Sequence, residues 1–303
     1  MAIITTGSFA KALWPGVNKW YGQSYAEYPV EYTKLFDTFK SKRNYEEDVG
    51  TSGFGLAITK TEGGPIQYDT ERQGFTTRYT HVVYGLGFII TREMFEDDLY
   101  DVVGQKKARA LAFSARQTKE VIGANVYNRA FNSSYVGGDG KELISSAHPL
   151  VAGGTASNIL STASDLSEAA LEQAYIDIGL FKNDRGLTIS VRPQSLIIPV
   201  QLEFEATRIL KSSGRVGTDN NDLNALNTMG AFPKGIIVNH FLTDTDAWFI
   251  RTDVQDGMKY WERRADEFAM DNDFDTENAK FKNTSRFSFG FTDWRQMYGC
   301  AGA

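Results

Sequence analysis

The amino-acid sequence predicts an α+β protein in which long, projecting elements accompany one compact mixed region. Three observations predict this fold class. Residues 92–132 carry apolar side chains at spacings near three and four, which is typical of a long helix. Two alternating runs flank a Gly-Gly-Pro turn, as in a long β-hairpin. Residues 165–245 then mix short helical and strand patterns.

The composition excludes several classes of function. The 303 residues carry a formal net charge of −6, whereas a protein that wraps nucleic acid needs a clustered cationic surface. One cysteine rules out a disulfide framework and a multi-cysteine zinc or iron–sulfur site, and three histidines leave little for a metal centre. No apolar run approaches the roughly 18 residues that cross a bilayer. We therefore expect a soluble chain made in a reducing cytoplasm.

The first 48 residues are rich in aromatic side chains and neutral overall. Pro29 suits the first turn of a helix, and a helical face follows it. That face holds Tyr32, Leu35, Phe36 and Phe39. Residues 2–23 show no sustained period, so we expect an extended arm whose aromatic side chains bury themselves on another surface. The aromatic residues singled out in this arm are Trp14, Trp20, Tyr21 and Tyr25.

Residues 49–91 carry the strand signal. Phe54, Leu56 and Ile58 alternate with small or polar residues, and a second alternating run follows at residues 75–83. Between the runs, Glu62, Gly63, Gly64 and Pro65 give a strong turn signal. Both runs are rich in Thr, Gln and Arg, so the hairpin is expected to project rather than to form core.

The helix over residues 92–132 is the clearest prediction. Thr91 is suited to cap its start, and acids early with bases later suit the helix dipole. A loop follows from Gly137 to Ser164. Further on we expect helices at 165–181, opened by a capping box, and at 202–210; strands at 187–191, 195–200, 235–242 and 247–251; a polar loop at 215–229; and long antiparallel strands over 259–298.

Candidate catalytic and metal motifs fail on inspection. Residues 271–275 (DNDFD) resemble the opening of a calcium loop, but Thr276 stands where glycine is needed and Lys282 where the closing glutamate is needed. No complete glycine-rich nucleotide motif, nucleophile elbow or zinc-protease motif occurs. We therefore expect no enzyme activity, no cofactor and no metal. The arm and hairpin instead indicate exposed apolar surface, which is typical of an interface.

Several stretches, in this order, resemble the major capsid protein of tailed phages, which has the Hong Kong 97-like fold. They are residues 84–93 (YGLGFIITRE), 139–149, 157–158, 195–199 (SLIIP), 205–210 (EATRIL), 247–250 (AWFI) and 286–294. The sequence of these stretches is most similar to that of the major head subunit of Mu-like phages and prophages. The resemblance implies an N-terminal arm at 1–48, an extended loop at 49–91, a peripheral domain at 92–164 and 246–303, and an axial domain at 165–245.

The resemblance also implies the function and partners. The subunit would assemble with itself, as hexamers and pentamers, into the icosahedral shell of a tailed double-stranded DNA phage. Portal and scaffold or decoration proteins would be partners, the packaged DNA would be contacted only non-specifically, and no membrane would be involved. The chain would be made in the host cytoplasm and end in the virion. Subunit-interface residues would be Trp14, Trp20, Tyr21, Tyr25, Gly63, Gly64, Pro65, Arg215, Asp219 and Asn220.

Two alternatives stay open at this stage. An encapsulin-like nanocompartment would use the same fold around a protein cargo. A β-rich protein that binds a small ligand or glycan would be a stable monomer. Some capsid relatives weld subunits through a lysine–asparagine bond, and Lys60 lies near the hairpin turn. The sequence identifies neither the asparagine nor the catalytic acid, so we interpret Lys60 as an ordinary exposed lysine.

Overall fold

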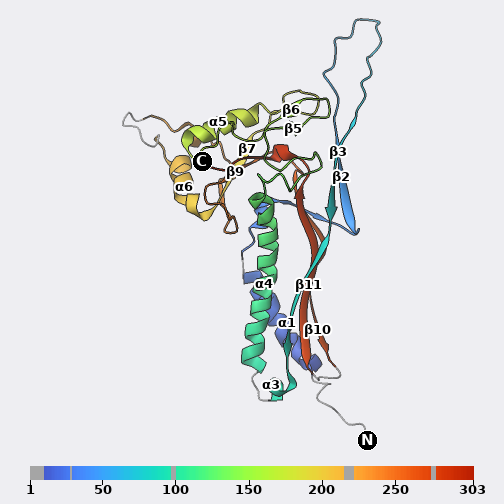
Figure 1. Ribbon diagram of the computed structural model, residues 1–303, viewed down its shortest axis with the longest axis vertical. Coiled ribbons are helices and arrows are strands. Elements are labelled where there is room, and N and C mark those ends of the chain that lie inside the picture. Colours follow the sequence, from blue (N-terminus) through green and yellow to red (C-terminus); the bar gives the residue numbers. More distant parts are fainter. Residues whose placement is uncertain (1–9, 28, 97–99, 215–221, 274–277) are drawn as a thin grey trace.

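The computed structural model of the chain describes residues 10–27, 29–96, 100–214, 222–273 and 278–303. Figure 1 shows an elongated part, built from long helices and strands that run side by side, and a more rounded part at one end of it. A long loop projects from the same end. The α+β prediction is confirmed.

The elongated part is built on a four-stranded sheet in the order β1-β10-β11-β4. β1 runs parallel to β10, and the other neighbours are antiparallel. Helix α4 lies along this sheet, with α1 packed beside α4 (Figure 1). The bounds are β1 Asp37–Lys40, β10 Met258–Asn272, β11 Ala279–Phe291, β4 Val82–Ile90, α1 Ala10–Glu27, α3 Arg92–Glu96 and α4 Tyr100–Asn128.

Aromatic pairs hold this sheet together. Along β11, alternate side chains are buried, which is the strand period that the sequence shows. Phe281 of β11 stacks on its cross-strand partner Phe88 of β4, with ring centroids 4.9 Å apart. Phe287 stacks on Tyr84, its diagonal neighbour across the strands, at 4.7 Å. Such cross-strand pairs stabilise a sheet beyond the area that they bury.

The predicted long helix is confirmed as α3 and α4, although α4 ends at Asn128, short of residue 132. Thr91 accepts the backbone N–H of Met94 at 3.4 Å, as expected for its cap. Gly123 allows the helix to approach its neighbours closely. A Cβ atom there would lie 3.3 Å from the ring of Phe289 and 3.4 Å from the Cβ of Tyr32. The glycine that weakens the helical pattern therefore serves packing.

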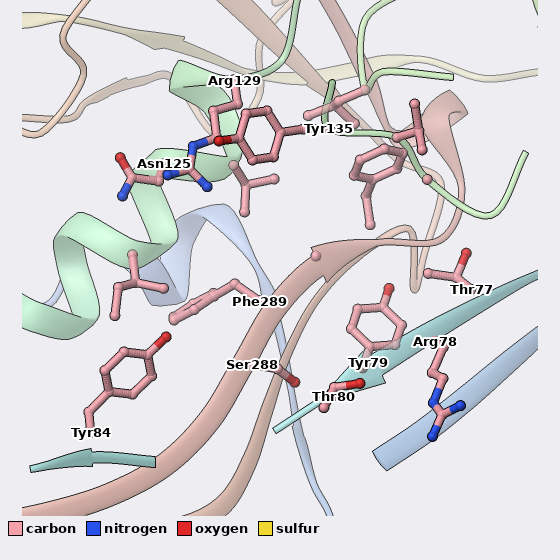
Figure 2. A pocket seen from close by; sticks show the side chains of 17 residues that line it. Thr77, Arg78, Tyr79, Thr80, Tyr84, Asn125, Arg129, Tyr135, Ser288 and Phe289 are labelled. Carbon is pink, nitrogen blue, oxygen red and sulfur yellow. The ribbon is translucent and has the colours of Figure 1, made fainter. Parts of the chain in front are cut away.

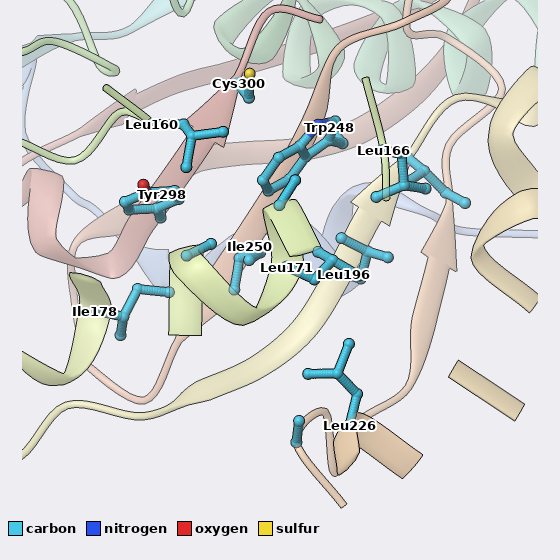
Figure 3. Close-up of a cluster of buried hydrophobic side chains, with 14 of the residues drawn as sticks. Leu160, Leu166, Leu171, Ile178, Leu196, Leu226, Trp248, Ile250, Tyr298 and Cys300 are labelled. Atoms are coloured by element: carbon cyan, nitrogen blue, oxygen red, sulfur yellow. The ribbon is translucent and has the colours of Figure 1, made fainter. Parts of the chain in front are cut away.

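The rounded part has a second four-stranded sheet, in the order β12-β9-β7-β8. Helices α5 and α6 pack on it around Leu171, Leu196 and Trp248, all fully buried (Figure 3). Ser167 caps α5 by accepting the N–H of Ala170, so the N-cap lies two residues after the predicted helix start at residue 165. The bounds are β12 Met297–Cys300, β9 Trp248–Thr252, β7 Pro193–Ile198, β8 Ile236–Val238, α5 Glu168–Gly179, η2 Val200–Leu202, α6 Glu203–Lys211 and α7 Ala225–Thr228.

β9 and β12 share this sheet with β7 and β8. The boundary drawn at residue 245 therefore separates β8 from strands of the same sheet. Residues 246–303 contribute to both parts, because β10 and β11 belong to the first sheet. The remaining elements are α2 Tyr32–Leu35, β2 Tyr45–Thr51, β3 Gln73–Thr80, β5 His148–Pro149, β6 Thr155–Ala156 and η3 Trp294–Gln296.

The predicted extended arm over residues 2–23 is wrong for residues 10–23, which lie in helix α1 (Ala10–Glu27). Pro15 and Gly16 interrupt the apolar period in the sequence, so no helical pattern is visible there. Packing of α1 against α4 provides stabilisation that intrinsic propensity lacks. Residues 1–9 of the arm lie outside the described residues.

Two further local predictions are wrong. Phe39 lies in β1, opposite Trp261 of β10, and not on a helical face, because the chain becomes extended at Phe36. Residues 187–191 form no strand; Thr188 makes only an isolated bridge to Lys182 across the turn at residue 186. The backbone groups of these residues instead hydrogen-bond to neighbouring residues of the same turn. The loop at 215–221 and the acidic turn at 274–277 lie outside the described residues.

Asn158 fastens the loop after α4 to the C-terminal strand, and it is fully buried. Its Oδ1 accepts the N–H of Ser145 at 2.8 Å. Its amide donates to the carbonyls of Leu143, Trp294 and Met297. One side chain therefore satisfies four backbone groups from segments that are far apart in the sequence.

We expect Asn158→Ala to lower the free energy of unfolding by about 2 kcal/mol or more, because buried backbone groups lose their partners. Urea denaturation followed by tryptophan fluorescence measures this. Asn132→Ala is the matched control, since exposed Asn132 only accepts from the nearby Ser134 N–H. A control that destabilises the protein as much as Asn158→Ala would contradict this role.

Candidate assembly surfaces

Residues 52–72 form an extended loop whose apolar side chains face solvent. β2 and β3 are paired as far as Thr51 and Gln73, and the residues between them belong to no strand. Figure 1 shows the loop projecting beyond both parts of the molecule. Leu56 is 79% exposed and Tyr68 is 91% exposed. Three more apolar side chains of the loop are exposed: Phe54, Ile58 and Ile66.

The base of this loop is fixed to the elongated sheet by polar contacts. The Tyr79 hydroxyl lies 2.6 Å from Thr292 Oγ1, which in turn donates to Asp48 at 2.8 Å. Lys259 of β10 completes the group by an ion pair with Asp48. β2 and β3 are therefore held on β10 and the end of β11, and the loop extends from an anchored base.

His81 lies at the same junction, between β3 and β4. It is buried, and its Nδ1 lies 2.9 Å from Ser288 Oγ, while its Nε2 has no hydrogen-bond partner within the described residues. Burial lowers the pKa of its imidazole below the ordinary value, and the Arg286 guanidinium lowers it further. Arg263 acts in the same direction and Glu46 in the opposite one.

Helix α1 covers one face of α4 and β10 through a polar and aromatic contact. Tyr21 is buried and stacks on Phe268, with centroids 4.5 Å apart. The Tyr25 hydroxyl donates to Asp266, which also pairs with the buried Lys119. Burial, together with the bond to Asp266, raises the pKa of Tyr25, so the phenol stays a neutral donor. The arm aromatics singled out at this position pack on their own chain.

The ten predicted interface residues therefore occupy different situations. Gly63, Gly64 and Pro65 lie at the predicted turn, where the Gly64 N–H donates to Thr61 at 3.0 Å. Tyr21 and Tyr25 contact α4 and β10, and Trp14 and Trp20 lie in α1. Arg215, Asp219 and Asn220 lie outside the described residues. That any of these contacts another subunit stays a prediction.

The apolar side chains of the loop were not among the predicted interface residues. Phe54, Leu56 and Ile58 were noted only as strand signals, and Ile66 and Tyr68 were missed. The signal was available, because apolar residues at even positions recur on both sides of the turn within an otherwise polar hairpin.

A cleft of about 430 Å³ lies between β3, β11 and the C-terminal end of α4 (Figure 2). Arg129 stacks on Tyr135 at its rim, 4.3 Å from the ring centroid. The lining side chains include hydroxyls, one amide and two arginines, but no Asp, Glu, His or Cys. The cleft therefore offers no carboxylate, imidazole or thiol to act as a base or nucleophile.

His148 and Asp139 form the pair most similar to catalytic machinery, with His148 Nδ1 2.6 Å from Asp139 Oδ2. His148 Nε2 faces Asn158 Oδ1 at 3.1 Å, and the ring stacks on Trp294 at 4.6 Å. Both ring nitrogens are occupied and the side chain is fully buried. The pair is placed to fasten the loop and not to accept a substrate proton. Among the described residues, no group of His, Cys, Asp and Glu could hold a metal ion, and no helix is long and apolar enough to span a membrane.

The geometry thus offers an exposed apolar loop on an anchored base, and comparison with known proteins assigns the fold. A model of the family described as phage capsid protein matches residues 74–299. The chain belongs to this family. No curated protein matches its sequence significantly.

Solved capsid structures share the fold at low sequence identity. The capsid of a native GTA particle aligns with a TM-score of 0.56 and 10% identity, covering 90% of each chain. The procapsid of bacteriophage JBD30 gives 0.53 and 14%, covering 97% of this chain and 75% of the other. A virus-like particle from Pyrococcus furiosus gives 0.52 and 11%, covering 94% and 97%.

The predicted Hong Kong 97-like fold and the predicted function as a structural major capsid protein are confirmed. The encapsulin-like alternative shares the fold, so the family match, and not the fold, favours the phage capsid protein. The closeness to Mu-like phages stays a prediction.

The buried His81 of this capsid protein predicts acid sensitivity. The unfolded chain protonates His81 near its ordinary pKa of about 6.5, whereas the folded state resists protonation, so stability falls as the pH drops below that value. We expect His81→Gln, which keeps a partner for Ser288, to lose less stability than the wild type between pH 7 and pH 5. Chemical denaturation at both pH values measures the difference. Equal losses of stability in the two proteins would count against His81 as the source of the acid sensitivity.

Proposed function

We propose that this capsid protein assembles with copies of itself, through hexamers and pentamers, into an icosahedral shell around double-stranded DNA, and that the extended loop carries a principal contact. The observation behind this is the set of five apolar side chains in residues 54–68 that the chain itself leaves uncovered. Large exposed apolar surfaces on an anchored element mark interaction sites.

The pairing of β2 with β3 supports a closed form of the loop. Thr51 lies opposite Gln73, and the Ser52 N–H donates to Arg72 O in the same register. Continuing this register outward places Leu56 opposite Tyr68 and Ile58 opposite Ile66. Residues opposite one another in an antiparallel pair share a face, and so do residues two apart. All five apolar side chains would then form a single face.

The magnitude of this contact is sufficient to matter. Burying one large apolar side chain yields about 1.5 to 3 kcal/mol, so five side chains give a gross gain of roughly 7 to 15 kcal/mol. Ordering the loop and fixing the subunit offset part of this gain. In a shell, each subunit would make the contact and also receive it, so even a modest net gain per contact accumulates over the lattice.

The domain roles follow from the two parts of the fold. We assign the elongated part to the peripheral domain and the rounded part to the axial domain, with β9 and β12 added to residues 165–245 because they share its sheet. The segment 215–229, predicted as a loop but containing helix α7, would lie near the symmetry axis of the capsomers. The formal charge of −6 suits an inner wall that contacts packaged DNA only non-specifically.

The remaining expectations belong to the same proposal. The protein acts mechanically and not as an enzyme, it is made in the host cytoplasm and ends in the virion, and portal and scaffold or decoration proteins join it there.

The double variant Leu56→Ser, Tyr68→Ser tests the loop contact. We expect folded subunits, because neither side chain is part of a core, and a loss of closed shells by at least tenfold in negative-stain counts. The matched control is Ala57→Ser, Gln67→Ser. In the same register these two residues lie opposite one another on the other face of the loop, so this variant should assemble normally.

Three results would contradict the proposal. Normal shells from Leu56→Ser, Tyr68→Ser would remove the loop contact. A wild-type protein that stays monomeric at high concentration would favour a ligand-binding protein, and particles filled with a protein cargo and no nucleic acid would favour a nanocompartment.

A further inference from the structure

Arg185 binds the base of the extended loop from a different region of the fold. It lies in the turn between α5 and β7, more than 100 residues along the chain from the loop. Its Nε donates to Gly53 O at 3.2 Å, and its Nη2 approaches both Asp69 oxygens at 3.1 and 3.2 Å. The same nitrogen also donates to Thr70 O. One guanidinium thus holds both runs of the loop.

The loop presents a matching acceptor. Asp69 Oδ2 accepts the N–H of Gly55 at 2.8 Å, and Oδ1 accepts the N–H of Thr70 at 2.8 Å. These backbone bonds, with Arg185 adding to them, lower the pKa of the Asp69 carboxyl below its ordinary value. Asp69 therefore stays ionised at neutral pH, joins the two runs of the loop and keeps its charge for Arg185.

The turn that carries Arg185 is itself held firmly. Asn183 Oδ1 accepts the N–H groups of Arg185 and Leu187, both at 2.9 Å. Arg295, whose side chain is almost fully buried, donates to Lys182 O at 2.9 Å and pairs with Asp184 at 3.1 Å. Arg185 is thus presented by a turn that is fastened to the core of the rounded part.

No other side chain of the described residues outside the loop hydrogen-bonds to residues 53–72. The direction of the loop beyond β2 and β3 therefore depends on this contact. From Gly53 to the turn at Gly63, extended chain at about 3.3 Å per residue gives a lever of about 30 Å. A rotation of about 10° at the base would displace the turn by about 5 Å, enough to misplace an apolar contact.

We propose that Arg185 is a positioning residue for shell assembly: by binding Gly53, Asp69 and Thr70 it fixes the direction in which the extended loop leaves the subunit, and so where the loop meets a second copy of this chain. This inference rests on the proposed loop contact. It adds a coupling between the rounded part and the loop, because any shift of the turn at 182–188 is passed on to the loop.

Hydrogen exchange and shell imaging together test the proposal. In Arg185→Ala we expect peptides covering residues 53–72 to exchange at least fivefold faster, with peptides from α5 and β7 unchanged. Shells should become fewer and more variable in diameter. Arg185→Lys should give exchange rates between those of the wild type and Arg185→Ala, since an ammonium keeps the charge but cannot bind several acceptors in the fixed geometry of a guanidinium. Asp69→Asn removes the charge from an exposed residue outside any core and should reproduce the effect without risk to folding.

Arg208→Ala is the matched control. Arg208 pairs with Glu205 at 3.3 Å on α6 and makes no hydrogen bond to the loop, so its loss should leave exchange of residues 53–72 and shell diameter unchanged. Wild-type exchange rates in Arg185→Ala and Asp69→Asn would overturn the proposal, as would uniform wild-type shells despite faster exchange. A wild type that forms no shell would instead overturn the proposed function, while the exchange rates would still decide whether Arg185 fixes the loop.

Discussion

The structure depends on one imbalance: the described residues bury apolar side chains in three clusters but leave those of the extended loop in water. Trp248, Tyr127 and Phe281 are almost completely buried, whereas Tyr68 and Leu56 are almost bare. Exposed apolar surface has a free-energy cost that only association can remove. A capsid subunit that must join its copies benefits from this arrangement, because the two most exposed large apolar side chains of the described residues, Tyr68 and Leu56, lie on a projecting element.

Polar contacts within the subunit and apolar contacts offered to a neighbour have separate roles. Asp48 with Lys259, and Arg185 with Asp69, hold the loop by bonds whose geometry is directional. The apolar side chains beyond them supply area, which is non-directional. Directional bonds define where the loop points. In the proposed shell, the apolar face supplies the free energy of association when the loop contacts a neighbouring subunit. Polar contacts also hold helix α1 within the subunit, where Tyr25, Lys119 and Asp266 fix it on α4 and β10.

Much of this fold could be predicted from the sequence, where the pattern was local. The long helix, the turn at Gly63, strands β7, β10 and β11 and helix α6 follow from periodicity and turn chemistry. Helix α1 could not be predicted, because Pro15 and Gly16 hide its period and α4 stabilises it. Phe39 kept helical spacing but was drawn into β1 by pairing with Trp261. The Arg185 contact joins residues more than 100 positions apart, and no local pattern in the sequence indicates it.

A cryo-electron microscopy map of the assembled shell tests the central claim most directly. It shows whether Leu56, Ile58 and Tyr68 of one subunit are buried against another. We expect a closed loop whose apolar face lies on a neighbouring copy, with Arg185 still bound to Asp69. A shell in which these side chains remain in solvent would contradict the account.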